Sequence, residues 1–183
     1  VDIVDTHVIY AGSYGMDREI QLYPYLTQSY NYIGINHNAP GLLGDRRVRE
    51  AIAYAMDRKD IISKVFSNNA QAVDVPIPPD SWFYDSDLRI FDYQPLVAQQ
   101  ILKEAGWTDS NGDGILDMHN EEGIMDLSFT INANMDNNMQ KEVLNLIIEQ
   151  LGEVGIDVKL RLLPWEDYVE ALKEGDFEAV LGE

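Results

Sequence analysis

The sequence predicts an α/β or mixed α+β domain built around one sheet, because segments with strand periodicity and segments with helical periodicity interleave along the chain. The last third shows this most clearly. Apolar residues alternate with polar ones over 127–132 and again over 156–162, which predicts two half-buried strands. Between them, residues 138–152 carry apolar side chains at helical spacing. A shorter helix over 165–174 then leads to a closing strand that begins at Phe177.

The first part of the chain predicts a strand followed by two helices. A strand is expected over 30–36, with Tyr32 on one of its faces. A helix capped by Asp45 follows this strand. Its inward-facing residues recur at helical spacing, and they are Val48, Ala51, Ile52, Ala55 and Met56. A second, shorter helix is expected over about 60–66.

A long connection punctuated by prolines is expected over 73–95. The helix after it begins near Pro95, because proline is favoured in the first turn of a helix. The same helix ends at Gly106, since glycine readily adopts the left-handed conformation that terminates helices. An acidic loop over 109–120 then precedes the last third.

The length and charge of the chain limit its class and its partners. A length of 183 residues is that of one domain, with 45% hydrophobic and 25% charged residues. The 32 Asp and Glu residues against 13 Lys and Arg give a formal net charge of −19. That charge would repel a nucleic-acid backbone or an anionic membrane, so neither is expected as a partner. The absence of cysteine excludes a disulfide scaffold, a thiolate zinc site and a cysteine nucleophile.

No enzyme signature is present in the sequence. No G-x-G-x-x-G motif follows a strand, and no Gly-Lys-Ser/Thr phosphate loop occurs. The Gly12–Gly15 segment is one residue too short for a nucleophile elbow. The three histidines lie far apart in the sequence, without the spacing that a metal pair on a helix requires. We therefore expect no enzymatic activity.

The acidic loop matches the calcium-loop template over its first nine positions. Its candidate ligands supply oxygen atoms on alternate residues, and they are Asp109, Asn111, Asp113, the Ile115 carbonyl and Asp117. Gly114 occupies the position at which the template turns sharply, but Asn120 replaces the bidentate Glu of the twelfth position. The sequence thus leaves two interpretations open: a weak Ca²⁺ site, or an Asx-rich turn without an ion.

Two other clusters allow a binding or a structural interpretation. Asp80 and Asp85 bracket the aromatic residues 82–84, an arrangement that also occurs in sugar-binding sites. The favoured interpretation is that these aromatic rings pack the long connection onto the core. Three arginines on the first helix could meet a ligand carboxylate, and they are Arg46, Arg47 and Arg49. We favour a structural role for them, in which they pair with the abundant carboxylates.

Both ends of the chain are strand-like, over Val1–Asp5 and Phe177–Leu181. Natural domains usually begin and end in polar linkers. We therefore expect a piece of a longer protein that is bounded by two strands. These two strands should lie side by side in one sheet.

Several segments together resemble one known family. In chain order they are 30–36, 45–58, Pro76–Pro79 with Trp82, Tyr93–Pro95, Ile101–Trp107, Gly155–Val158, Trp165–Tyr168 and Gly175–Ala179. Their order and spacing resemble the bacterial extracellular solute-binding proteins of family 5, the peptide- and nickel-binding receptors of ABC importers. The resemblance covers the chain from about residue 28 onward.

The resemblance implies a two-lobed receptor with the type II periplasmic-binding-protein fold, in which helices flank a mixed sheet. Residues 1–183 would form a single lobe, the C-terminal-lobe segment between the two hinge strands. The implied function is solute capture, with peptides as the expected solute, by closure of the two lobes and delivery to an ABC permease. The implied protein is monomeric and extracytoplasmic, either periplasmic or a cell-surface lipoprotein.

Three residues are expected to contact the ligand. Trp165 stands where oligopeptide receptors place a tryptophan that lines the cleft. Lys141 stands close to the position at which the dipeptide receptor uses an arginine against the ligand carboxylate, although a lysine lacks the bidentate fork. Tyr32 is the third candidate. Two alternatives remain open: an oligosaccharide receptor of the same family, and a calcium-dependent structural or adhesion module built on the acidic loop.

Overall fold

The structure is a computed structural model of the chain. The residues that it describes are 21, 23, 29–39, 41–77, 81–85, 87, 91–120 and 123–183. The chain divides into two compact units. The smaller unit comprises residues 1–29 and 58–88, and the larger unit comprises residues 30–57 and 89–183. The predicted strand Val1–Asp5 lies outside the described residues.

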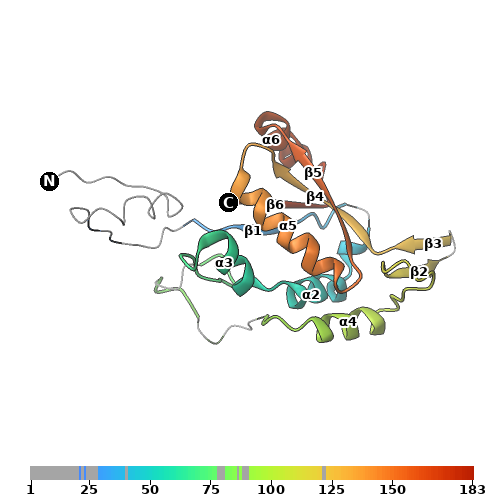
Figure 1. The fold of residues 1–183 in the computed structure, drawn as a ribbon. Helices are drawn as coiled ribbons and strands as arrows, with labels where there is room; N and C mark the ends of the chain where they lie inside the picture. Colours follow the sequence, from blue (N-terminus) through green and yellow to red (C-terminus); the bar gives the residue numbers. More distant parts are fainter. Residues whose placement is uncertain are drawn as a thin grey trace. The chain divides into compact units, whose positions relative to one another are not determined.

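A four-stranded mixed sheet forms the centre of the larger unit (Figure 1). Its strands are β1 (Tyr32–Ile35), β4 (Ser128–Asn134), β5 (Asp157–Leu163) and β6 (Ala179–Gly182), in the order β1-β6-β4-β5. Strand β4 runs parallel to both β5 and β6, whereas β1 runs antiparallel to β6. The predicted α/β class and mixed sheet are confirmed. Strand β6 begins at Ala179, two residues later than predicted.

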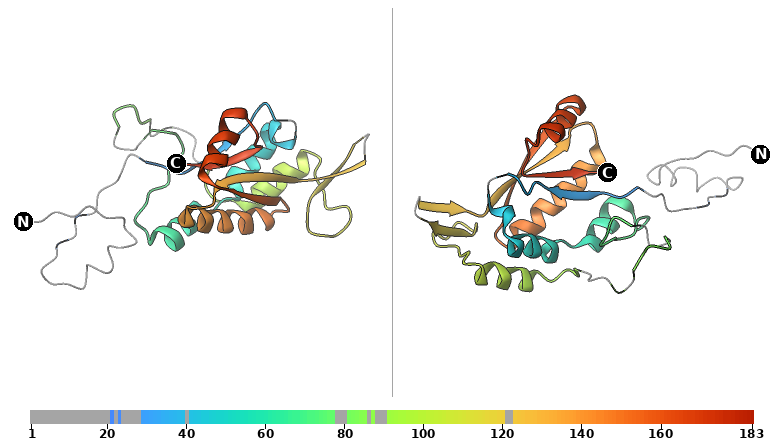
Figure 2. Two further views of the ribbon diagram at one scale, coloured as in Figure 1. Left: turned by 90° about the horizontal axis from the view of Figure 1, so that it is seen from above. Right: turned by 180° about the vertical axis from the view of Figure 1, so that it is seen from behind.

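Helices cover both faces of this sheet. Helix α5 (Asn138–Gly152) connects β4 to β5, and helix α6 (Trp165–Glu174) connects β5 back to β6 on the other side of β4. The two connections run in opposite directions across the sheet, so right-handed crossovers require their helices to lie on opposite faces. Figure 2 shows α5 and α6 on opposite sides of the strands. Both helices have the predicted boundaries.

The core of the larger unit lies between the sheet, α5 and a layer of two further helices. Helix α2 (Arg46–Ala55) follows the short 3-10 helix η1 (Leu42–Gly44) and is capped by Asp45, whose side chain accepts a bond from the Arg47 N–H. Helix α4 (Pro95–Glu104) packs against α2 and begins with the predicted proline. The inward residues of α2 are buried as predicted, except that Met56 lies just past the helix end: Val48, Ala51, Ile52 and Ala55.

A β-hairpin interrupts the region that the sequence assigned to a loop. Strand β2 (Asp117–Asn120) pairs with β3 (Gly123–Asp126) outside the main sheet. The acidic loop is therefore shorter than predicted, because its last residues extend into a strand. The isolated bridge between Thr108 and Asp117 ties the base of the loop to this hairpin.

The smaller unit contains helix α3 (Arg58–Phe66), which begins two residues before the predicted start. Arg58 forms an ion pair with Asp74 at 2.6 Å. In the described part of 73–94 no helix or strand occurs, as predicted for this connection. The rings of Trp82 and Phe83 are exposed and lie against each other at 3.6 Å between centroids. The smaller unit by itself does not bury these two rings, and their packing onto the core stays a prediction.

None of the helices in the described ranges is both long enough and apolar enough to cross a lipid bilayer.

Candidate functional site

The carboxyl edge of the sheet is the candidate site. Strands β4, β5 and β6 are parallel, so their carboxyl ends share one edge. Helices α5 and α6 begin at this edge, because each directly follows a strand. Strand β1 is antiparallel and starts there, with Tyr32 opposite Gly182. In open α/β sheets ligands bind outside the carboxyl ends of the strands.

Four aromatic residues gather at this edge, and we call them the aromatic row: Trp165, Tyr168, Tyr32 and Tyr30. Trp165 is the first residue of α6 and is 55% exposed. Its ring stacks on Tyr168, with centroids 5.9 Å apart and an angle of 26° between the planes. Tyr32 is 45% exposed, and its ring centroid lies 5.9 Å from that of Tyr30. These distances are typical of aromatic pairs.

Tyr168 is the buried member of the aromatic row. Tyr168 is only 5% exposed, and its hydroxyl donates a 2.9 Å hydrogen bond to the Leu181 carbonyl. Burial raises the pKa of the Tyr168 phenol above its ordinary value, and the neighbouring Tyr32 raises it further. Tyr168 therefore links α6 to strand β6 while supporting the exposed ring of Trp165.

Tyr32 lies across the end of β6. A Cβ atom placed on Gly182 would meet the Tyr32 ring at 2.6 Å from Cζ and 3.0 Å from Cε1. Glycine therefore provides the space in which this ring lies flat on the strand. The exposed side of the ring remains open to a ligand.

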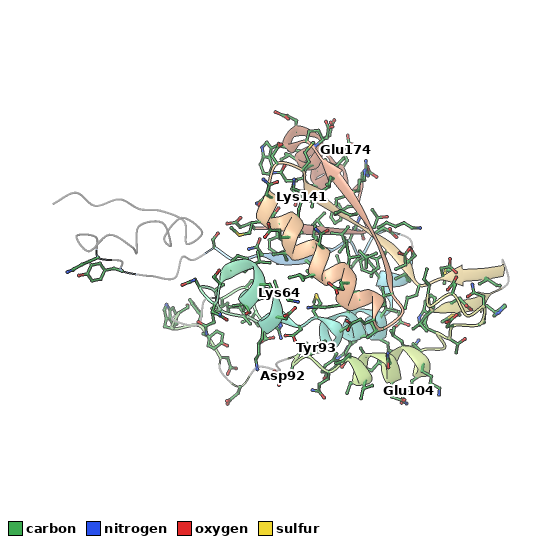
Figure 3. The ribbon with its side chains drawn as sticks, in the orientation of Figure 1. Lys64, Asp92, Tyr93, Glu104, Lys141 and Glu174 are labelled. Atoms are coloured by element: carbon green, nitrogen blue, oxygen red, sulfur yellow. The ribbon has the colours of Figure 1, made fainter. Side chains whose placement is uncertain are left out.

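Polar and charged groups flank the aromatic row at the start of α5. Asn137 caps this helix, and its Oδ1 accepts a 3.1 Å bond from the Gln140 N–H. The Gln140 side chain reaches the Oδ1 of Asn31, next to β1, at 3.5 Å. Lys141 is the next residue and lies in the same first turn (Figure 3). The structure thus places all three predicted ligand residues, Trp165, Lys141 and Tyr32, on elements that start at one edge.

The opposite end of the sheet carries a polar cleft of ≈ 720 Å³. Its lining comes from the end of β1, from β4 and β5, and from the α6–β6 connection. Asn36 Nδ2 donates to the carbonyls of Gly175 and Phe177, each at 3.0 Å. Asn132 is 1% exposed and its Nδ2 donates to the Asp176 carbonyl at 3.0 Å. These side chains hold the 175–178 segment in place.

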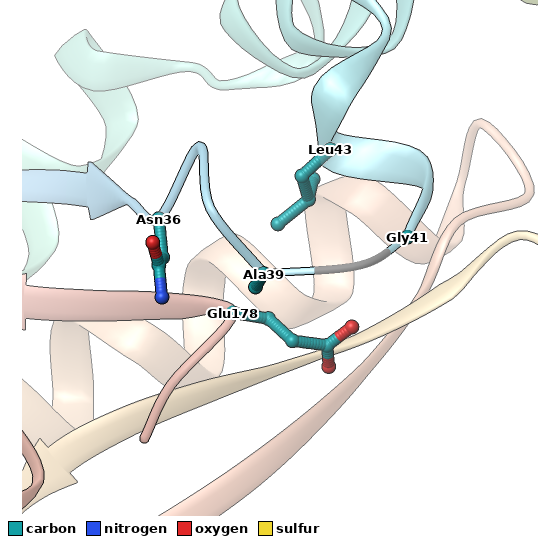
Figure 4. A pocket seen from close by; sticks show the side chains of 5 residues that line it. All are labelled: Asn36, Ala39, Gly41, Leu43 and Glu178. Atoms are coloured by element: carbon teal, nitrogen blue, oxygen red, sulfur yellow. The ribbon is translucent and has the colours of Figure 1, made fainter. Parts of the chain in front are cut away.

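Glu178 and Asn36 also border a narrower pocket on the side of η1. Its lining residues come from three segments and are Asn36, Ala39, Gly41, Leu43 and Glu178 (Figure 4). The Glu178 Oε2 accepts a 2.8 Å bond from the Thr130 N–H of β4. The carboxylate therefore completes the backbone bonding of a strand.

The carboxylates of the acidic loop accept bonds from the loop itself. Asp109 accepts from the Gly112 and Gly114 N–H groups at 2.7 and 3.1 Å, and Asp113 accepts from the Ile115 N–H at 2.8 Å. The Asn111 side chain bonds to Asp113 at both its amide oxygen and its amide nitrogen. Such bonds are those of Asx turns.

Asp117 faces away from solvent at the base of the loop. It is fully buried and accepts bonds from the Ser110 hydroxyl and N–H at 2.7 and 2.8 Å. These bonds lower the pKa of Asp117 below its ordinary value. Over the described ranges, no group of three or more His, Cys, Asp and Glu residues is arranged to hold a metal ion. The calcium site stays a prediction.

Two of the three arginines of α2 have structural roles. Arg47 pairs with the cap residue Asp45 at 2.7 Å, and this bond lowers the pKa of the Asp45 carboxyl. Arg49 donates to the carbonyls of Leu43 and Gly44 at 2.9 and 2.8 Å. The predicted pairing with a carboxylate is confirmed for Arg47. Arg49 also has a structural role, but its partners are backbone carbonyls, so the predicted carboxylate partner is wrong there.

Sequence reasoning missed Tyr168 and Gly182. Tyr168 occupies an inward position of an amphipathic helix, which predicts a core residue and gives no sign of its contact with Trp165 or Leu181. Gly182 stands at a strand end, where a glycine carries no information about the ring above it. Only the pairing of β1 with β6 brings Tyr32 to this position.

Comparison with known proteins identifies relatives over most of the chain. The "Oligopeptide-binding protein AppA" of Bacillus subtilis is 37% identical over 160 residues, which cover 85% of this chain and 28% of the relative. The solved structure of AppA in complex with a nonapeptide has a TM-score of 0.83 at 34% identity, covering 96% of this chain and 34% of that one.

A second solved structure that resembles this chain is of a relative bound to a sugar. The mannohexaose-bound periplasmic oligopeptide-binding protein of an oligopeptide ABC transporter of Thermotoga maritima has a TM-score of 0.73 at 28% identity. The structural match covers 83% of this chain and 29% of the Thermotoga maritima chain. This chain thus spans about a third or less of the length of these relatives. Residues 2–183 match the model of the "Bacterial extracellular solute-binding proteins, family 5 Middle", and the chain therefore belongs to this family of solute-binding receptors, which are not enzymes.

Proposed function

We propose that this chain contributes one lobe to an extracytoplasmic receptor that captures peptides for an ABC importer. The observation that carries the proposal is the exposed Trp165 at the carboxyl edge, stacked on a buried support. Exposed aromatic rings on a rigid base are suited to bind apolar ligand surface. The 37% identity to AppA, which is named for oligopeptides, favours a peptide as the ligand.

Charges near the aromatic row favour a ligand with charged ends. Lys141 lies in the first turn of α5, where the helix dipole adds positive potential. Glu166 and Asp167 follow Trp165 in the first turn of α6. A peptide carries one positive and one negative terminus. It can therefore use both kinds of group at one edge, which a neutral saccharide cannot.

An oligosaccharide is the second candidate. Aromatic rings beside amides also form sugar sites, and the edge offers the exposed Asn31 amide, to which the buried Gln140 side chain bonds, beside its tyrosines. The mannohexaose-bound relative is also similar in structure to this chain. The two candidates differ in the need for Lys141, because a neutral sugar has no carboxylate for it to meet.

In the proposed mechanism the ligand is enclosed when a second lobe closes on this edge, and the closed receptor is recognised by the permease. The receptor acts as a monomer. Because a single lobe supplies only part of the contacts, we expect weak binding to the 183-residue chain. A dissociation constant of about 1 mM corresponds to about −4 kcal/mol.

The test uses the three tryptophans of the chain as separate reporters, because each indole N–H gives its own NMR signal. A tryptophan-free nonapeptide at millimolar concentration should shift the signal of Trp165. The buried Trp107 and the exposed Trp82 of the smaller unit should keep their signals. Single Trp→Phe variants assign the three signals.

Two variants separate the ligand classes. Lys141→Gln should weaken the response to the nonapeptide and leave any response to mannohexaose unchanged. Lys103→Gln, on the exposed side of α4, is the matched control. A Trp165 signal that responds to mannohexaose and not to the peptide would replace the peptide proposal by the sugar alternative. A Trp165 signal that responds to neither would remove this edge as the binding surface.

A further inference from the structure

We infer that Tyr168 and Gly182 are positioning residues that set the pose of the two exposed rings, Trp165 and Tyr32. Trp165 and Tyr32 are the two most exposed residues of the aromatic row. Tyr168 acts through a ring contact and a hydroxyl bond, and Gly182 acts through the space it leaves. The inference deepens the proposed function, on which its meaning for ligand binding rests.

The Leu181 carbonyl explains why a hydroxyl is needed at Tyr168. Successive carbonyls of a strand point to opposite edges, and the Glu178 carbonyl accepts the Asn36 N–H on the β1 side. The Leu181 carbonyl, three residues later, therefore points to the β4 side. The ladder between β4 and β6 contains only the pairs Ile131–Ala179 and Asn132–Val180.

Beyond Val180 the two strands are no longer paired, so β4 has no bond to give to the Leu181 carbonyl. The Tyr168 hydroxyl takes that place at 2.9 Å. The Glu178 carboxylate performs the matching role at the other end of the ladder, where it accepts the Thr130 N–H. Side chains thus close both ends of a two-residue ladder.

The same bond fixes the ring on which Trp165 stacks. The hydroxyl bond and the Cβ attachment fix the long axis of the Tyr168 ring, and the burial of Tyr168 restricts rotation of the ring about that axis. The plane of Trp165 lies within 26° of this ring. If the hydroxyl bond is lost, the support can tilt, and the exposed indole will tilt with it.

Gly182 acts on Tyr32. An added Cβ would lie 2.6 Å from Cζ and 2.7 Å from the hydroxyl oxygen of Tyr32, and its three nearest atoms all belong to that side chain. Gly182 does not have a positive φ, so its backbone accepts an alanine without strain. Gly182→Ala must therefore displace the outer end of the Tyr32 side chain.

The first experiment tests Gly182 by a double-mutant cycle. Gly182→Ala should lower the melting temperature of the chain by a few degrees, and the same substitution in a Tyr32→Ala background should cost nothing. Gly44→Ala is the matched control, because nothing lies within 4 Å of its added Cβ. An equal cost of Gly182→Ala in both backgrounds would show that the glycine does not act through Tyr32, and would overturn this part of the inference.

The second experiment tests Tyr168 by the indole signal of Trp165. Tyr168→Phe keeps the ring but removes the hydroxyl, and it should shift the Trp165 indole N–H signal in the absence of any ligand. Tyr54→Phe, an equal loss of a phenol hydroxyl where the ring lies against Phe91, should leave that signal unchanged. A Trp165 signal that is identical in the Tyr168→Phe variant and the parent would overturn the role of the hydroxyl.

The third experiment connects the pose to binding. Tyr168→Phe and Gly182→Ala should each weaken binding of the tryptophan-free nonapeptide about tenfold, a factor worth about 1.4 kcal/mol. Gly44→Ala and Tyr54→Phe should leave the affinity unchanged. If both variants bind like the parent, the pose does not serve the ligand. If the parent does not bind the nonapeptide, the proposed function fails, and the first two experiments still decide whether the residues set the pose.

Discussion

The two ends of the sheet in the larger unit use their side chains in opposite ways. At the carboxyl edge, Trp165 and Tyr32 expose about half of their surface beside the cap of α5. At the amino end, the lining of the larger cleft includes Asn36, Asn132 and Arg161, which already bond to the 175–178 segment. Side chains that already bond within the protein leave little free surface for a ligand, however large the cleft. The edge that keeps unused surface on a rigid support is the better candidate.

The acidic loop resembles the amino end of the sheet in this respect. Asp109 and Asp113 accept backbone N–H groups of their own loop, and the buried Asp117 accepts both donors of Ser110. In both regions polar side chains bond to backbone groups of the protein itself. We therefore expect substitutions in these two regions to act on stability, and substitutions of the exposed rings at the carboxyl edge to act on ligand binding.

The largest expected effect concerns Asn132 at the amino end. Asn132→Ala removes a buried side chain and the bond that its Nδ2 donates to the Asp176 carbonyl. The free energy of unfolding, measured in urea, should fall by about 2–3 kcal/mol. Asn38→Ala, an exposed amide of the same cleft, is the matched control and should cost less than about 0.5 kcal/mol. Equal small costs for both variants would mean that the amino end is a free surface after all.

A smaller effect is expected for Tyr168, and it depends on pH. At neutral pH, Tyr168→Phe leaves the Leu181 carbonyl without its donor and should lower the free energy of unfolding by about 1 kcal/mol. The pKa of Tyr168 is raised above 10.0 by burial and by Tyr32, so the folded state holds the phenol proton more tightly than the unfolded state does. Its contribution is therefore fully present below pH 10.0 and is lost as the pH rises through the folded pKa.

Urea unfolding at a series of pH values from neutral to alkaline checks this sign. The parent should approach the Tyr168→Phe variant in stability at high pH, because a phenolate cannot donate to a carbonyl. A gap between the two that stays constant with pH would show that the hydroxyl bond does not contribute to stability.

Local patterns predicted the elements, and long-range pairing determined the site. Helix α5 was predictable because Asn137 caps a 15-residue amphipathic segment, and α6 because an acidic first turn precedes its apolar face. The alternation of Phe129 and Ile131 likewise predicted β4. Trp165 was predictable as a site residue only through the family resemblance. Its support, Tyr168, bonds to a carbonyl that belongs to another element, and no local pattern encodes that contact.

The acidic loop marks the opposite limit. Its spacing matches a ligand template, but spacing does not say where the oxygen atoms point. Asp117 is the clearest case: it fits the ninth position of the template, and in the fold it is the buried acceptor of Ser110 at the start of β2. A template match therefore predicts a turn with oxygen atoms on alternate residues, and the occupancy of those atoms depends on the neighbouring backbone.

The smallest expected effect is the response of this loop to calcium. Because its carboxylates already accept N–H bonds, an ion must compete for them, and we expect a dissociation constant near 1 mM, the weak end for extracellular sites. At about 2 mM calcium such a site adds roughly 0.6 kcal/mol of stability, since the gain is RT ln 3. In a chain of this length that raises the melting temperature by about 1–3 °C. Magnesium at equal ionic strength should do less, because it requires a stricter octahedron.

The calcium response can be assigned by one pair of variants. Asp113→Ala should remove the difference between calcium and magnesium, whereas Asp92→Ala, an exposed aspartate outside the loop, should retain it. Equal melting shifts with the two salts in the parent would mean that the cations only screen the net charge of −19. The loop would then be an Asx turn whose carboxylates serve the backbone alone, as Glu178 does for Thr130 at the amino end of the sheet.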